Sequence, residues 1–164
     1  MFSKYTFLLI PFLLTACGGT PPSAPPLSAA QINLKSMSLA AQRFDQFCIA
    51  SIGGPQDGVD LANAYYNVEA LPSLGSLKLS GNISGEDIGI QYDTQRRGCM
   101  VTSSQGKAPN GDDELKSLAT AYAARNGGTI EGGGMFVYTV KTPTTTAAFQ
   151  YADTPDGLYF QVEY

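Results

Sequence analysis

Any catalytic chemistry in this chain would depend on carboxylates, because its 164 residues include no histidine. Nucleophilic triads normally use an imidazole as the base, whereas two neighbouring carboxylates can act together as acid and base. Each acidic group in this sequence also suits a turn or the start of a helix, where carboxylates cap free backbone amides. We therefore predict structural roles for these groups and assign no catalytic residue. The groups are Glu86 with Asp87, Asp112 with Asp113 and Glu114, and Asp153 with Asp156.

Other patterns typical of reactive or ligand-binding sites are incomplete. The glycine runs at residues 127–128 and 132–134 neither precede a helix nor carry the lysine of a phosphate-binding loop. A calcium-binding loop is matched only in part, by Asp153, Asp156 and Gly157, because the remaining ligands are missing at the required spacing. The sequence predicts no cofactor and no metal site. Serine–lysine pairs carry little information because both residues are common; they are Lys35-Ser36, Lys78 with Ser80, and Lys116-Ser117.

The beginning of the chain has the pattern of an export signal. Lys4 precedes an apolar run at residues 5–14, which is too short for the ~20 residues that cross a bilayer as a helix. Small residues then lead into a cysteine, and Leu14-Thr15-Ala16-Cys17 resembles the lipobox of bacterial lipoproteins. The resemblance covers only the first 19 residues. It implies cleavage of a signal peptide, residues 1–16, a diacylglyceryl group on the Cys17 sulfur, and acylation of the new N-terminus.

The resemblance implies a location in the cell envelope. Several acyl chains, each adding about 0.8 kcal/mol per buried methylene, hold a protein on a membrane without a transmembrane helix. Gly18 stands where an aspartate would retain such a protein in the inner membrane of enteric bacteria, so the outer membrane facing the periplasm is favoured. Cleavage would leave 148 residues with nine basic and 14 acidic side chains. Such a chain lacks the basic stripe that nucleic acid requires, and we predict no nucleic-acid partner.

A lipid on Cys17 would leave Cys48 and Cys99 as an even pair. In an oxidising compartment such a pair is typical of a disulfide. The two residues are 51 positions apart, and in the chain-entropy model a bond across that loop adds about 4 kcal/mol to stability. No Cys-x-x-Cys redox motif is present, and two isolated cysteines are too few for a zinc site. We predict a structural disulfide between Cys48 and Cys99.

The rest of the chain divides into a tether and one domain. The tether, residues 17–27, consists of the cysteine and a run rich in proline and glycine. Such a run cannot sustain a helix or a central strand. Residues 28–164 are a natural size for a single domain. Apolar residues at three- and four-residue steps predict helices at residues 28–51, with Ser28 as the N-cap, at 56–70 and at 112–125.

Alternating patterns predict six short strands, at residues 77–80, 88–93, 99–103, 135–140, 144–151 and 158–164. Turn residues such as Gly81-Asn82 and Gly85 separate them. We therefore predict one α+β domain with about three helices packed on a mainly antiparallel sheet of about six strands, with one disulfide.

Nine tyrosines without a tryptophan supply amphipathic surface of the kind that is enriched where partners bind. Tyr159 and Tyr164 are the candidates for exposure. Ordinary packing of aromatic residues in a sheet is the main interpretation of this composition, ahead of an interface.

Three hypotheses for function follow. The main one is a lipid-anchored protein with a non-catalytic binding or structural role in the periplasm and another envelope protein as its partner. The second is a small periplasmic inhibitor of a hydrolase, which would present residues 102–109 or 129–134 to a foreign active site. The third is a lipid-tethered enzyme that uses carboxylates such as Asp112 or Glu86.

Overall fold

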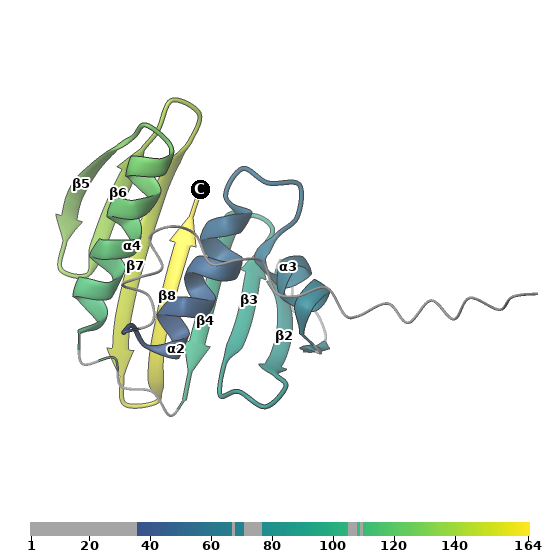
Figure 1. The fold of residues 1–164 in the computed structure, drawn as a ribbon. Coiled ribbons are helices and arrows are strands. Elements are labelled where there is room, and N and C mark those ends of the chain that lie inside the picture. Colours follow the sequence, from purple (N-terminus) through teal and green to yellow (C-terminus); the bar gives the residue numbers. More distant parts are fainter. Residues whose placement is uncertain (1–35, 67, 71–76, 105–107, 109) are drawn as a thin grey trace, which may run out of the picture.

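The computed structural model describes residues 36–66, 68–70, 77–104, 108 and 110–164 (Figure 1). The predicted signal peptide, Cys17, the tether and the expected N-cap Ser28 lie outside the described residues. Among the helices that are described, none has the length and apolar character needed to cross a membrane.

Eight strands form one sheet in which neighbouring strands run antiparallel. Their order across the sheet is β1-β2-β3-β4-β8-β7-β6-β5. The first four strands and the last four therefore make two meanders, which meet where β4 pairs with β8. The strands are β1 (Val68–Ala70), β2 (Leu77–Ile83), β3 (Gly89–Asp93), β4 (Gly98–Ser103), β5 (Thr129–Gly134), β6 (Val137–Lys141), β7 (Thr146–Thr154) and β8 (Gly157–Glu163).

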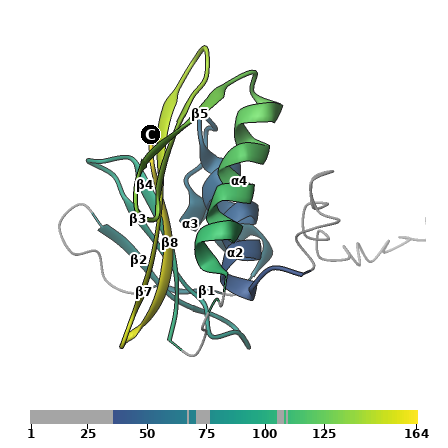
Figure 2. The same ribbon diagram turned by 90° about the vertical axis from the view of Figure 1, so that its left-hand side faces the viewer.

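The described helices lie on one face of this sheet (Figure 2). α2 (Leu39–Arg43) continues directly into a π-helix, η1 (Phe44–Ile49), and together they pack on the central strands β4 and β8. α3 (Gly58–Tyr65) packs on β2 and β3, whereas α4 (Gly111–Arg125) packs on β5, β6 and β7. Each meander therefore has its own helix, and the first helix covers the line where the two meanders meet.

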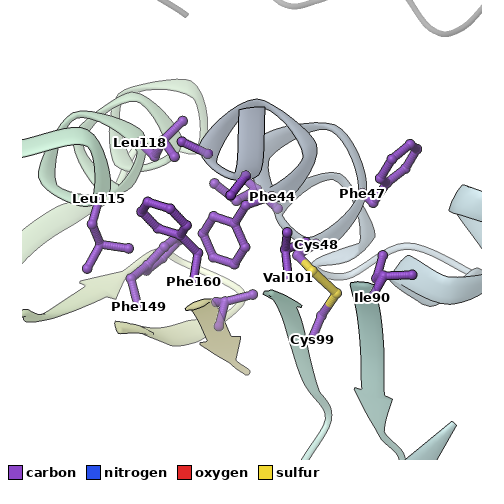
Figure 3. Close-up of a cluster of buried hydrophobic side chains, with 14 of the residues drawn as sticks. Phe44, Phe47, Cys48, Ile90, Cys99, Val101, Leu115, Leu118, Phe149 and Phe160 are labelled. Atoms are coloured by element: carbon purple, nitrogen blue, oxygen red, sulfur yellow. A yellow bond between two sulfur atoms is a disulfide. The ribbon is translucent and has the colours of Figure 1, made fainter. Parts of the chain in front are cut away.

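The core lies between the helices and the sheet, and aromatic rings fill its centre (Figure 3). Phe44 of η1 is fully buried, with its ring centroid 5.7 Å from that of Phe160 and 6.3 Å from that of Phe149. Leu115 of α4 is fully buried in the same cluster. Burying each such side chain stabilises the fold by about 1.5–3 kcal/mol. The rings of η1, β7 and β8 thus join the two meanders through one continuous core.

The predicted disulfide is confirmed. Cys48 and Cys99 are bonded with their Cα atoms 5.2 Å apart, a distance usual for such a bond. Both residues are fully buried, and the bond ties η1 to the central strand β4 (Figure 3). Gly58, the first residue of α3, packs against this bond so closely that a Cβ there would collide with the Cys99 sulfur. The disulfide therefore holds two helices and a strand at one point.

Two polar contacts join the first helix to α4. The backbone N–H and the hydroxyl of Ser38, the N-cap of α2, each donate to the Glu114 carboxylate at 2.7 Å. At the other end of α4, Arg125 donates to Asp45 of η1 at 3.3 Å. We call these four residues the helix clamp. Because Glu114 lies in the first turn of α4 and Arg125 in its last turn, the clamp holds both ends of that helix.

The predicted fold class is confirmed, and the structure has more strand than the local patterns indicated. The helix predicted at residues 56–70 ends at Tyr65, and Val68–Ala70 form β1 beside β2. Residues 129–134, which the inhibitor hypothesis presents as a loop and which are not among the six predicted strands, form the edge strand β5. β2 runs through the turn expected at Gly81-Asn82 because it continues to Ile83, which is fully buried.

Candidate binding groove on the open face of the sheet

No described helix or strand covers the second face of the sheet (Figure 2). In β4 the buried Cys99 and Val101 alternate with the half-buried Met100 and Thr102, so the latter two project away from the helices. We call this uncovered surface the open face. The same alternation and register place on it Gln91, Asp93, Gly98, Met100, Thr102, Ala148, Gln150, Tyr159, Gln161 and Glu163.

One row of the open face carries two acids on either side of a glycine. Asp93 of β3 pairs with Gly98 of β4, and Gly98 pairs with Glu163 of β8. Neighbouring strands lie about 4.8 Å apart, so the two acidic residues are separated by two strand spacings. A Cβ on Gly98 would lie 3.3 Å from Glu163 Cγ and 4.0 Å from Gln161 Nε2. The absence of a side chain at Gly98 therefore lets the Glu163 side chain lie close over β4.

The next row carries two amides on either side of a thioether. Met100 of β4 pairs with Gln91 on one side and with Gln161 on the other. The two rows, with Arg96 from the turn between β3 and β4, line a groove of about 210 Å³. Its lining residues are Gln91, Asp93, Arg96, Gly98, Met100, Gln161 and Glu163.

The electrostatics of this groove are dominated by its two acids. Glu163 accepts a hydrogen bond from Gln161 Nε2 at 2.8 Å, and its Oε1 lies 4.0 Å from Arg96 Nη1. The Arg96 side chain is 74 % exposed and that of Glu163 is 41 % exposed, so this ion pair is of the weak surface kind. Asp93 Oδ1 accepts from the backbone N–H groups of Gln95 and Arg96 at 2.9 and 3.2 Å, which shapes the turn. Two carboxylates and one guanidinium leave the groove with a net negative charge.

The first pair of predicted acids holds local structure on the helix side. Glu86 forms a two-pronged ion pair with Arg43 of α2, and this hydrogen-bonded contact raises the pKa of Arg43. Asp87 accepts from the hydroxyls of Ser103 and Ser104 at 3.1 and 2.7 Å. Both acids therefore fasten the turn between β2 and β3 to neighbouring elements.

The acids at the start of α4 also have structural partners. Asp112 accepts from the Tyr138 hydroxyl at 3.0 Å, which ties the helix to β6. Burial, followed by the hydrogen bond to Asp112, raises the pKa of Tyr138. Glu114 belongs to the helix clamp, and Asp113 is exposed in the same first turn. The predicted capping role is therefore corrected: Asp112 and Glu114 accept from other elements, and the N-cap of α4, Asn110, makes no side-chain cap hydrogen bond. Their position in the first turn still places carboxylates at the positive end of the helix dipole.

The remaining candidates from the sequence are dispersed. Asp153 and Asp156 lie exposed where β7 turns into β8. Lys116 and Ser117 are exposed on α4, and Lys35 lies outside the described residues. Within the described part of the chain, no three histidine, cysteine or acidic side chains gather as metal ligands. The structure therefore does not bring the sequence candidates together into one site.

The two singled-out tyrosines have different environments. Tyr159 pairs with Thr102 on the open face and is half-buried there. Tyr164, expected to be exposed, packs against the core, and its hydroxyl lies 3.1 Å from Ser51 Oγ. Arg97 lies over the Tyr164 ring at 5.4 Å. Burial raises the pKa of Tyr164 to about 12. The expectation for Tyr164 is corrected: it is half-buried, because it continues the alternation of Phe160 and Val162 on the core side of β8.

Sequence reasoning missed the groove residues because no local pattern pairs β4 with β8. The alternation of Gln91 and Asp93 with buried neighbours indicates a solvent-facing side of a strand, but not which strands lie beside it. The Gly98–Glu163 pair joins positions 65 residues apart in sequence.

No protein-family model matches the chain, and comparison with curated proteins and with solved structures gives no match either.

Proposed function

We propose that this protein is a lipid-anchored component of the bacterial cell envelope with a non-catalytic binding role in the periplasm. One observation carries the binding role: a face of the sheet that no described helix covers has a groove lined by two glutamines and a methionine, and Tyr159 lies on the same face. Tyrosine and methionine are enriched at interfaces, because they bring apolar area with a polar or adaptable group. The partner is another envelope protein that docks on the open face.

The lipobox supports the membrane anchor. Mass spectrometry of the native protein tests it, with the expected result that the chain begins at Cys17 and carries diacylglycerol on sulfur and a further acyl group, such as palmitate, on nitrogen. A Cys17→Ser variant should keep its signal peptide and lose the lipid. A bare Cys17 sulfur, or one bonded to Cys48 or Cys99, would contradict the anchor.

Site-specific photo-crosslinking in intact envelopes tests the binding role. A Tyr159→benzoylphenylalanine variant places the reactive group on the open face, and Ser117→benzoylphenylalanine places it on the exposed side of α4 as a matched control. We expect one discrete crosslinked protein from position 159 that is absent from position 117. Crosslinks from position 117 alone, or none from either, would refute binding through the open face.

The inhibitor hypothesis keeps one supporting observation. The turn between β5 and β6 presents Met135, which is 81 % exposed, beside Phe136, whose ring packs edge-on against Tyr151 at 5.9 Å. An apolar residue on a braced hairpin suits insertion into an enzyme cleft better than a flexible loop does. A panel of envelope hydrolases assayed with the wild type and with Met135→Asp tests this alternative, which requires inhibition that the substitution removes.

A further inference from the structure

We propose that the groove between Asp93 and Glu163 receives a basic side chain of the protein partner. This inference rests on the proposed function, since it names the chemistry by which that partner is recognised on the open face.

The size of the groove selects a side chain over a cofactor. Its volume is about 210 Å³, below the roughly 300–1,000 Å³ of pockets that enclose drug-sized ligands. Gly98 supplies the floor, and a side chain at that position would occupy the space beside Glu163. The groove lies on the flat face of a sheet, where a partner's surface can approach and insert one residue.

The charges of the groove select a cation. Asp93 and Glu163 line the groove from the two strands that flank Gly98. In the next row, the amides of Gln91 and Gln161 contain neutral hydrogen-bond acceptors, and the Met100 thioether offers apolar contact for an aliphatic stem. Arginine and lysine have this combination of an apolar stem and a cationic tip. Complementary charge of this kind gives specificity to a docking surface.

Arg96 acts as an internal competitor for the partner's cation. Its guanidinium lies 4.0 Å from Glu163 and its side chain is 74 % exposed, so it leaves Glu163 without breaking a buried contact. A basic ligand must displace Arg96, whereas an acidic ligand would recruit it. Removing Arg96 should therefore raise the affinity for a basic ligand and lower the affinity for an acidic one. The direction of the change distinguishes the two kinds of ligand.

The test uses the full chain in a neutral detergent with ¹³C-methyl-labelled methionine. The chain has four methionines, of which Met100 lines the groove, while Met37 and Met135 report on distant surfaces. The probes are N-acetylarginine amide and its neutral isostere N-acetylcitrulline amide, with N-acetylglutamate amide as an acidic probe. We expect the arginine probe to shift the Met100 methyl signal saturably at millimolar concentration, with no comparable shift from the other two.

Three variants sharpen this test. Glu163→Gln should lower the affinity for the arginine probe by about threefold or more. Arg96→Gln should raise it by about twofold or more, and both changes are of the size expected for single surface charges. Glu131→Gln is the matched control, because Glu131 forms an exposed ion pair with Lys141 on β5 and β6, away from the groove. It removes the same charge and should leave the affinity unchanged. Unchanged Met37 and Met135 signals verify folding in each variant.

Equal shifts from the arginine and citrulline probes, or weaker arginine binding in Arg96→Gln, would overturn the inference. Failure of the inference is separable from failure of the proposed function. If position 159 still crosslinks its partner in a Glu163→Gln background with undiminished yield, the open face binds without a basic side chain. If position 159 yields no crosslink in the wild type, the proposed function itself fails, whatever the probes do.

Discussion

The two halves of the sheet share a plan but are held by different means. In each half, a helical segment precedes four antiparallel strands, and the order of strands in one half mirrors that in the other. The first half, β1 to β4, is tied to its helices by the Cys48–Cys99 disulfide, against which Gly58 packs. The second half, β5 to β8, contains no cysteine and depends on packing and hydrogen bonds.

The second half has a longer helix, which makes close contacts with the strands. α4 has 15 residues, whereas α3 has eight. Gly111, at the start of α4, lies so close to the Tyr151 ring that any Cβ would collide with it. The Tyr138–Asp112 hydrogen bond fixes the same end of the helix to β6. The same strand topology is therefore stabilised by a disulfide in the first half. In the second half it is stabilised by a long helix and its contacts with the strands.

Removing the disulfide should have the largest effect and should separate the halves. In a Cys48→Ala, Cys99→Ala double variant, the chain-entropy model predicts a loss of about 4 kcal/mol in the free energy of unfolding. Hydrogen exchange should show the loss mainly in α3, β3 and β4, with less change in β5 to β7, because the bond lies in the first half.

Urea unfolding of the double variant, with and without a reducing agent, measures this loss. The reductant should lower the stability of the wild type and leave the variant unchanged. Uniform loss of protection across both meanders would instead show that the shared aromatic core makes the sheet one cooperative unit, and the comparison of independent halves would fail.

The parts of the fold that were predictable from sequence are those set by local periodicity. Helix α4 was expected from its apolar spacing and its acidic first turn, and it begins and ends within one residue of that expectation. The π-helical turn of η1 was not expected, since Phe44, Phe47 and Cys48 suit an α-helical face equally well. β5 was missed because three glycines suppress the strand pattern, and only its pairing with β6 fixes it.

The candidate groove shows the same division between local and long-range information. Its acids and amides lie on β3 and β8, which flank β4 only because β8 returns to the centre of the sheet. Sequence patterns can mark one face of each strand as polar, but the order of strands comes from packing of the whole core. The acids that drew attention as sequence neighbours, such as Asp112 and Glu86, proved to be partners of Tyr138 and Arg43.

Weakening the helix clamp should have a smaller effect and act on both halves at once. Ser38→Ala removes the N-cap of α2 and the hydroxyl that donates to Glu114. Loss of such a cap costs about 1 kcal/mol, within a usual range of 0.5–2. Ser117→Ala, on the exposed side of α4, is the matched control and should change stability by less than about 0.5 kcal/mol.

Thermal unfolding and hydrogen exchange of both serine variants check this expectation. In Ser38→Ala, amides at the start of α2 and of α4 should lose protection together, since one serine caps the first helix and binds the other. Loss confined to α2 would mean that the hydroxyl bond from Ser38 to Glu114 adds nothing to the hold on α4.

An effect no larger than this is expected at Tyr164, which follows β8 of the second half and contacts Ser51 and Arg97 of the first. Burial raises its pKa from 10.0 to about 12 in the folded protein. The folded state therefore holds this proton more tightly than the unfolded state, so the resulting stability is complete below pH 10 and is lost as the pH rises through 12.

Tyr164→Phe should cost about 1 kcal/mol at pH 7 through the lost hydrogen bond to Ser51. Urea unfolding at intervals from pH 7 to pH 12 should show the wild-type advantage shrinking above pH 10, because phenylalanine has no proton to lose. If the difference in free energy of unfolding between the wild type and Tyr164→Phe stays constant over this range, the Tyr164 hydroxyl is exposed to solvent in the folded protein. The two halves would then be joined by the aromatic core and the helix clamp, without a contribution from Tyr164.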